Sequence, residues 1–238
     1  MTWTLFLEQC LNGLQFGLML FLLAAGLTLI FGIMDLINLA HGSLYMIGAY
    51  LVATLTEASG SFLLASVLGI AATAIIGMVI EALVLRGLYK RDHLSQVLAT
   101  FALLLIANET TRAIWGIQPM SLNVPPTLSG PVELLPGLNY PAFRLVIIGI
   151  GLTVAISLYF VVRRTRIGML VRAGAANRRM ATAMGTNIKW LFTAVFGAGA
   201  ALCALAGAML GPLLAVQVGM GENILILAFV TVVIGGIG

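Results

Sequence analysis

Long runs of apolar residues without charge are the feature that most restricts how this chain can fold. A helix needs about 20 apolar residues to cross the hydrocarbon core of a bilayer, and uncharged runs approaching that length recur along the chain. The runs are residues 9–34, 42–56, 58–80, 93–108, 145–162, 190–214 and 223–238. The sequence therefore predicts an all-α fold, a polytopic transmembrane helix bundle with seven visible spans.

Composition explains why most of the outer surface of the folded chain must face lipid. Of the 238 residues, 61% are hydrophobic and 8% are charged, whereas a soluble domain carries about 25% charged residues. Twelve Lys and Arg with eight Asp and Glu cannot cover a water-soluble surface on a chain of this length. We therefore expect a single transmembrane domain over residues 1–238. Because the last run is still apolar at Gly238, we also expect the chain to be truncated before a last span.

The basic residues predict an orientation. Ten of the twelve lie in two clusters that are separated by two predicted spans, so both clusters belong on one side of the membrane. The positive-inside rule makes that side the cytoplasm. The N-terminus and the Pro-rich loop at about 116–141 then lie outside, and no nucleic-acid partner is needed to explain the net charge of +4. The clusters are Arg86, Lys90 and Arg91, then Arg163, Arg164, Arg166, Arg172, Arg178, Arg179 and Lys189.

A polar interruption, MDLINLAHG at 34–42, separates the first two apolar runs. It can be a capped cytoplasmic turn, in which Asp35 and Asn38 bind backbone groups. It can instead be a break within the membrane that lines a transport pathway, because polar groups at membrane depth are costly and usually functional. In a third interpretation His41 relays protons. We take Asp35, Asn38, His41 and Gly42 as the candidate pathway residues.

A basic segment at about 163–189 is too long for a simple turn. Apolar residues recur at helical spacing along it, Arg178 points the opposite way, and Gly185 provides a stop signal. We expect one short amphipathic helix, which either lies on anionic lipid or is presented to a cytoplasmic partner. The small alanines favour the partner. The apolar positions are Met169, Ala173, Ala176, Met180, Ala183 and Met184.

Motifs for chemistry are missing. No Gly-Lys pair exists, so the chain has no phosphate-binding loop of the G-x-x-x-x-G-K-[ST] type, and no protease or hydrolase motif is present. Cys10 and Cys203 lie in apolar runs without metal-ligand spacing. We therefore expect no enzyme activity, no catalytic residue, no cofactor and no metal. Among the remaining charges, Glu81 is expected to pair with Arg86, and Glu109 with Arg112.

Three stretches of the sequence resemble one family, the permease subunits of bacterial branched-chain amino-acid ABC importers. They are MDLINLAHGSLYMIGAY (34–50), AGAANRRMATAMGTNIKW (173–190) and TVVIGGIG (231–238). The resemblance implies a bacterial inner-membrane location, a second permease subunit or a second copy, two cytoplasmic ATPase subunits and a periplasmic substrate-binding protein, besides membrane lipid.

The same resemblance makes the basic segment the one that couples the permease to its ATPases. It implies a coupling role for Arg172, Ala173, Ala175, Ala176, Arg179, Met180 and Gly185. One departure is that Gly174 stands where the general importer motif has Glu before Ala-Ala.

The implied function is ATP-driven import of branched-chain or hydrophobic amino acids, or related small solutes, by alternating access. The alternative is a secondary transporter or channel that acts alone on a small solute such as urea or a short amide, with Asp35, His41 and Glu81 carrying protons. An inverted pair of charged, broken spans, which many such transporters have, is missing from the sequence. A scaffold subunit without a pathway of its own is the third hypothesis.

Overall fold

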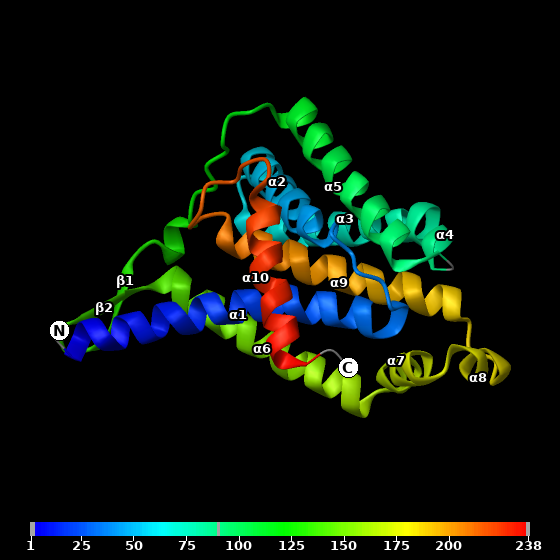
Figure 1. The fold of residues 1–238 in the computed structure, drawn as a ribbon. Coiled ribbons are helices and arrows are strands. Elements are labelled where there is room, and N and C mark those ends of the chain that lie inside the picture. Colours follow the sequence, from blue (N-terminus) through cyan, green and yellow to red (C-terminus); the bar gives the residue numbers. More distant parts are fainter. Residues whose placement is uncertain (1–2, 90, 237–238) are drawn as a thin grey trace.

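The apolar runs of the sequence fold into helices. A computed structural model describes residues 3–89 and 91–236, and its long helices follow the uncharged stretches (Figure 1). The long helices are α1 (Trp3–Met34), α2 (His41–Ser59), α3 (Phe62–Ile80), α5 (His93–Trp115), α6 (Ala142–Arg164), α9 (Ile188–Leu210) and α10 (Met220–Gly235). The shorter helices are α4 (Arg86–Leu88), α7 (Arg166–Ala176) and α8 (Arg178–Ala183). A π-helical turn, Glu81–Leu85, joins α3 to α4.

Short polar side chains determine where several helices begin. Ser61, Asp92 and Asn187 are N-caps, and each accepts a hydrogen bond from a backbone N–H in the first turn of the helix that follows. The Ser95 hydroxyl also donates to Asp92 across 2.7 Å. The hydrogen bonds from the Ser95 hydroxyl and backbone hold the pKa of the exposed Asp92 carboxyl below its usual value.

Within residues 3–89 and 91–236, five helices are long and apolar enough to cross a membrane. They are α1, α3 continued by α4, α5, α6 and α9. The multi-pass helical bundle is therefore confirmed with five such helices, whereas α2 and α10, at the second and seventh predicted spans, are outside this set. α10 has 16 residues, about 24 Å of helix, which is less than the roughly 30 Å of a bilayer core. Residues 237–238, where the truncation was expected, lie outside the described residues.

A β-hairpin interrupts the expected all-helical pattern. Strands β1 (Pro131–Leu135) and β2 (Leu138–Pro141) pair antiparallel within the Pro-rich loop. Gly137, at φ 85°, supplies the left-handed residue that the tight turn after Pro136 requires. The prolines that excluded helix here do not exclude a short two-stranded ribbon, because its outer edges need no N–H donors.

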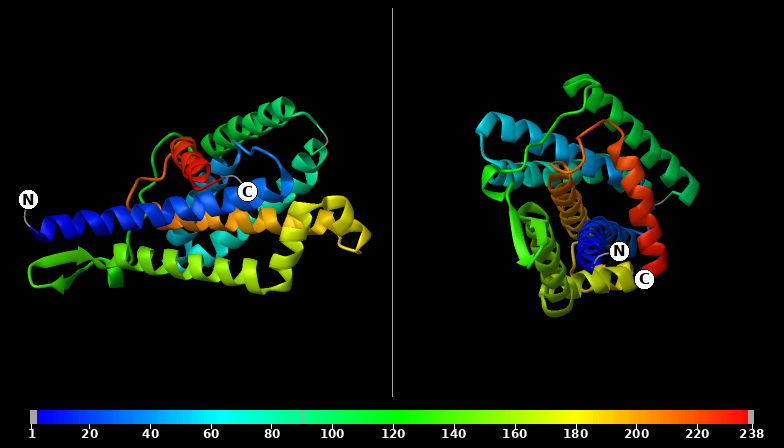
Figure 2. Two further views of the ribbon diagram at one scale, coloured as in Figure 1. Left: turned by 60° about the horizontal axis from the view of Figure 1, so that its bottom comes forward. Right: turned by 90° about the vertical axis from the view of Figure 1, so that its left-hand side faces the viewer.

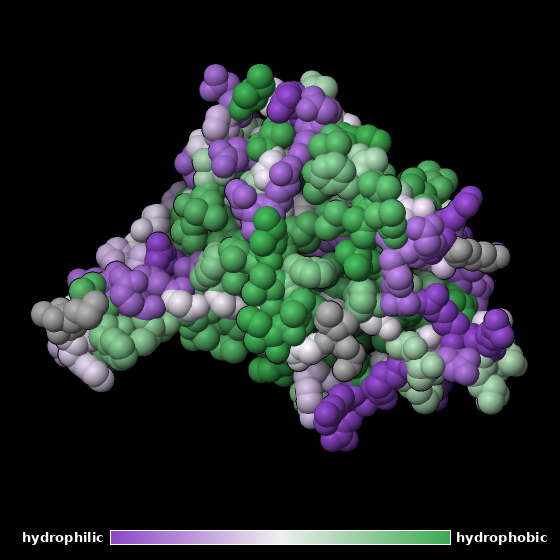
Figure 3. All heavy atoms as spheres, in the orientation of Figure 1, coloured by the Kyte–Doolittle hydropathy of each residue, from purple (hydrophilic) through white to green (hydrophobic). Residues whose placement is uncertain are grey.

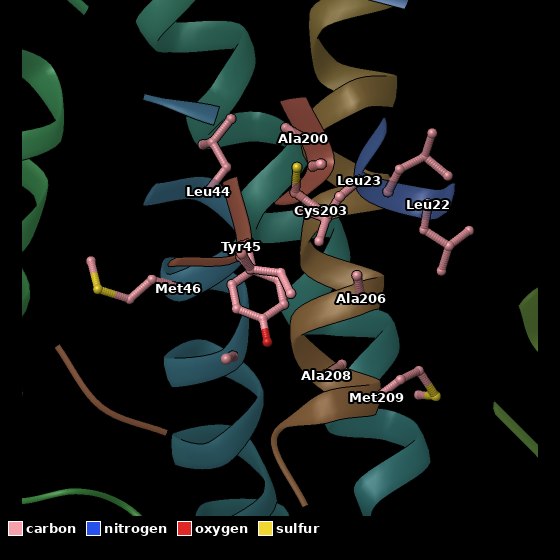
Figure 4. Packing of buried hydrophobic residues seen from close by; sticks show 14 of the residues in the cluster. Leu22, Leu23, Leu44, Tyr45, Met46, Ala200, Cys203, Ala206, Ala208 and Met209 are labelled. Carbon is pink, nitrogen blue, oxygen red and sulfur yellow. The ribbon is translucent and has the colours of Figure 1, made fainter. Parts of the chain in front are cut away.

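Helix α9 occupies the centre of the bundle. It packs against α1, α2 and α3, and the end-on view shows these helices around it while α10 lies across the direction of α1 (Figure 2). Small residues permit the close approach, since a Cβ on Gly48 of α2 would come within 2.5 Å of the Ala204 Cα of α9. Tyr45 of α2 lies beside Cys203 and Ala206 of α9 in the same core (Figure 4).

The two basic clusters meet at one end of the bundle, as the sequence predicted. The α4 turn and the α7–α8 segment lie at this end, while the first residues of α1 and the β-hairpin lie at the opposite end (Figure 1). On the face shown in Figure 3, apolar side chains cover much of the middle, and hydrophilic ones gather toward its edges and ends. Lys90 of the first cluster lies outside the described residues.

Candidate functional site

The α1–α2 link, residues 35–40, is not helical. It begins at Asp35, which is exposed and adopts φ 51°, a left-handed conformation that Asp tolerates better than most residues. The Asp35 backbone N–H donates to the Phe31 carbonyl across 2.8 Å and so closes the last turn of α1. Asp35 therefore occupies the place that Gly usually takes after a helix.

The link returns into the bundle and does not simply turn at its end. His41, the first residue of α2, is fully buried. Its Nε2 lies 3.3 Å from the Leu23 carbonyl oxygen and 2.9 Å from the Cys203 Sγ. Leu23 precedes the last residue of α1, Met34, by 11 positions, about 16 Å along the helix. The polar interruption thus starts as a turn and ends deep among the helices.

Side chains satisfy the unwound backbone of the link. The Thr100 hydroxyl of α5 donates to the Ile37 carbonyl across 3.3 Å. The Asn38 side-chain oxygen accepts from the Ala40 N–H across 3.1 Å. Non-helical backbone inside a membrane bundle persists only where such partners or a wet cavity exist. These two hydrogen bonds therefore help to hold the link in its non-helical conformation.

Two buried polar atoms at this end of the α1–α2 link have no hydrogen-bond partner among the described residues. They are the Asn38 amide nitrogen and the His41 Nδ1, and both side chains are almost completely buried. Asn38 also borders a groove of about 230 Å³, whose other walls are apolar. A buried amide without a partner costs free energy, so these two atoms are costly features of the fold.

Gly42 is needed for packing. A Cβ at this position would overlap the Gly221 carbonyl group at the start of α10. Of the four candidate pathway residues, the structure brings Asn38, His41 and Gly42 together inside the bundle and leaves Asp35 exposed at its basic end.

The basic segment forms two helices, so the prediction of one amphipathic helix is wrong. Asn177 breaks it because its backbone is extended, at φ −156° and ψ 100°, and its side chain caps α8 through the Met180 N–H at 3.0 Å. The predicted apolar face remains exposed on both helices, with Met169, Met180 and Met184 more than half exposed. Every predicted coupling residue is exposed as well, namely Arg172, Ala173, Ala175, Ala176, Arg179, Met180 and Gly185.

Gly174 is buried against α9. A Cβ at this position would meet the Leu191 side chain at 3.1 Å, with Ile188 and Ile33 just beyond. A Glu here would bury its carboxylate among apolar groups, which is costly without a partner. This cost is a physical reason why position 174 holds Gly and not the Glu of the general importer motif.

Both predicted ion pairs are present. Arg86 lies 3.0 Å from Glu81, and Arg112 lies 3.1 Å from Glu109. The sequence did not predict that Glu81 also accepts hydrogen bonds from the Tyr89 hydroxyl at 2.8 Å and the Thr193 hydroxyl at 2.6 Å. The sequence signal that could have indicated these contacts is the position of Glu81, a lone carboxylate at the end of an apolar run. Of the two cysteines, which both lie in apolar runs, Cys203 is buried and Cys10 is exposed.

Comparisons with known proteins agree on one family. The model of the "Branched-chain amino acid transport system / permease component" family matches residues 9–238. The permease protein BraD of the high-affinity branched-chain amino acid transport system of Pseudomonas aeruginosa is 29% identical over 98% of this chain and 80% of its own length. LivH, the corresponding permease of Escherichia coli, is 28% identical over the same shares. No solved structure matches the chain significantly.

Proposed function

Because this chain belongs to the family of branched-chain amino acid transport system permease components, we propose that it is the membrane-spanning subunit of an ATP-driven importer. Members of this family are membrane transport subunits and not enzymes. The proposed cargo is branched-chain or other hydrophobic amino acids, or related small solutes, moved by alternating access. The observation that carries the proposal is the exposed apolar face of α7 and α8 at the basic end of the bundle.

The proposed partners follow from this role. Two cytoplasmic ATPase subunits dock at the basic end, a second permease subunit or a second copy completes the pathway, and a periplasmic binding protein delivers the solute. The whole chain acts as one transmembrane domain in a bacterial inner membrane. Basic residues then face the cytoplasm and the N-terminus lies outside. α2 takes the second pass, and α10, which is too short to cross the core by itself, forms part of the seventh.

Arg172, Ala173, Ala175, Ala176, Arg179, Met180 and Gly185 form the proposed ATPase-coupling surface. Small exposed side chains let a partner groove approach the helix backbone closely, as Ala does in helix-in-groove recognition. The arginines supply charge for steering and orientation.

Ala176→Asp tests this surface. The change places a charge at the proposed apolar contact, so in proteoliposomes containing the full complex we expect substrate-stimulated ATP hydrolysis and uptake at least tenfold lower. Co-purification of the ATPase subunits should weaken as well. Ala58→Asp, the same change at an exposed site near the opposite end, should leave ATPase co-purification intact. Unaltered assembly and transport in Ala176→Asp would contradict the coupling assignment.

Asp35, Asn38, His41 and Gly42 are the proposed pathway residues. Support comes from the return of the α1–α2 link into the bundle and from the unpartnered Asn38 amide beside an apolar groove. A polar group just behind an apolar wall can orient a solute when the side chain turns toward the groove.

Asn38→Leu tests the pathway. The change replaces the hydrogen-bonding amide with an apolar group of the same heavy-atom branching, and we expect uptake by the assembled complex to fall about tenfold while ATPase co-purification persists. Asn139→Leu, at an exposed position of the hairpin, is the matched control and should transport normally. Normal transport by Asn38→Leu would favour the scaffold hypothesis. Uptake by the purified chain alone, driven by a pH gradient without ATP, would instead favour the stand-alone transporter, which the comparisons do not support.

A further inference from the structure

The carboxyl end of α1 is held by a side chain from the basic segment. α1 has no basic residue in its last turn, although a cation there would offset the partial negative charge of the helix end. The guanidinium of Arg178, the first residue of α8, donates to the Ile33 carbonyl across 2.9 Å. Arg178 follows Ile33 by 145 positions, so the missing cation is supplied from a distant part of the chain.

Arg178 is itself fixed in place. Its guanidinium carbon lies 5.3 Å from the centre of the Phe192 ring, a cation–π contact, and it is only partly exposed. Phe192 meets the Tyr89 ring edge-on, with ring centres 5.3 Å apart. Tyr89 then donates to buried Glu81 and lies 3.4 Å from the sulfur of Met34, the last residue of α1.

The hydrogen bond between Arg178 and the Ile33 carbonyl spans a cleft. A space of about 550 Å³ separates the end of α1 from the α7–α8 junction. Phe31, Gly32, Ile33 and Asp35 line one side, and Ala175, Ala176, Asn177, Arg178 and Arg179 line the other. The cleft gives α8 room to move relative to α1. The Arg178 hydrogen bond joins the two sides one residue before Met34 and two before the α1–α2 link.

We propose that Arg178 is a positioning residue that transmits displacement of α7 and α8 to the α1–α2 link. This inference rests on the proposed function, in which ATPase subunits push on the exposed face of these helices. The link is the deformable part of the connection, because it lacks helical hydrogen bonds and depends on single contacts such as that of Thr100. A shift of the Ile33 carbonyl therefore reaches Asn38 and His41, which end the link inside the bundle.

The first test uses the purified chain alone in lipid nanodiscs and measures backbone hydrogen exchange. Arg178→Ala should accelerate exchange of amides 35–41 at least tenfold, because the end of α1 loses its anchor. Arg178→Lys, which keeps a cation and a donor but loses the planar contact with Phe192, should fall between Arg178→Ala and the natural chain. Arg91→Ala removes an exposed Arg at the same end of the bundle and should change nothing. Equal exchange in Arg178→Ala and the natural chain would refute the proposed role of Arg178 in holding the end of α1.

The second test measures solute transported per ATP hydrolysed by the assembled complex. Arg178→Ala should lower this ratio at least fivefold, and Arg178→Lys should restore part of it. A merely structural role would instead reduce the amount of folded complex and leave the ratio unaltered, which would overturn the proposal. If the natural complex shows no ATP-driven uptake at all, the proposed function fails, and the exchange experiment still decides the Arg178 contact separately.

Discussion

Glu81→Ala should lower the free energy of unfolding by about 3–5 kcal/mol, the cost of removing one partner from a buried ion pair. The Glu81 side chain is fully buried, and it accepts from Arg86, Tyr89 and Thr193. Without the carboxylate, these donors lose a common acceptor, and the partly buried guanidinium loses its counter-charge. Reversible unfolding of the purified chain in detergent micelles, followed by circular dichroism, measures the change.

Glu109→Ala is the matched control for Glu81→Ala. It removes the same side chain from a pair that is mostly exposed, since Glu109 is 67% and Arg112 is 50% exposed. Pairs of this kind contribute about 0–1 kcal/mol. If the two substitutions lowered the free energy of unfolding equally, the hydrogen bonds of Glu81 to Arg86, Tyr89 and Thr193 would not stabilise the contact between α4 and α9.

Gly48→Leu should cost about 3 kcal/mol or more, because overpacking forces backbones apart. A Cβ at Gly48 would lie 2.5 Å from the Ala204 Cα and 2.6 Å from its Cβ. Neither of these atoms can move without displacing α9, the central helix of the bundle. The thermal-unfolding midpoint in micelles should fall accordingly, together with the yield of monodisperse protein.

Gly149→Leu makes the same substitution on α6 at an exposed glycine, where nothing lies within 4 Å of an added Cβ. Its effect should be neutral to slightly stabilising, because Leu favours helix more than Gly does. A similar loss of stability at both positions would show that the closeness of α2 and α9 is not what makes Gly48 necessary.

Much of the site could be located from the sequence. The lone polar interruption at 34–42 and the basic segment at 163–189 stood out against an apolar background. How these two segments are arranged in three dimensions could not be predicted from the sequence. The same residues are compatible with a tight turn or with a link that returns to His41, because depth depends on how far α2 is drawn into the bundle. Similarly, helical spacing could not reveal the break at Asn177, where a capping side chain competes with the helix.

The sequence by itself determined the class of protein and the gathering of the two basic clusters at one end of the bundle, because hydropathy and charge act locally along the chain. Only the tertiary structure decided which distant groups meet. Thr193 binds Glu81 across 112 positions, and Arg178 reaches Ile33 across 145. In an apolar bundle a buried polar group without a partner is costly, and several partners here come from helices that close packing around α9 brings together.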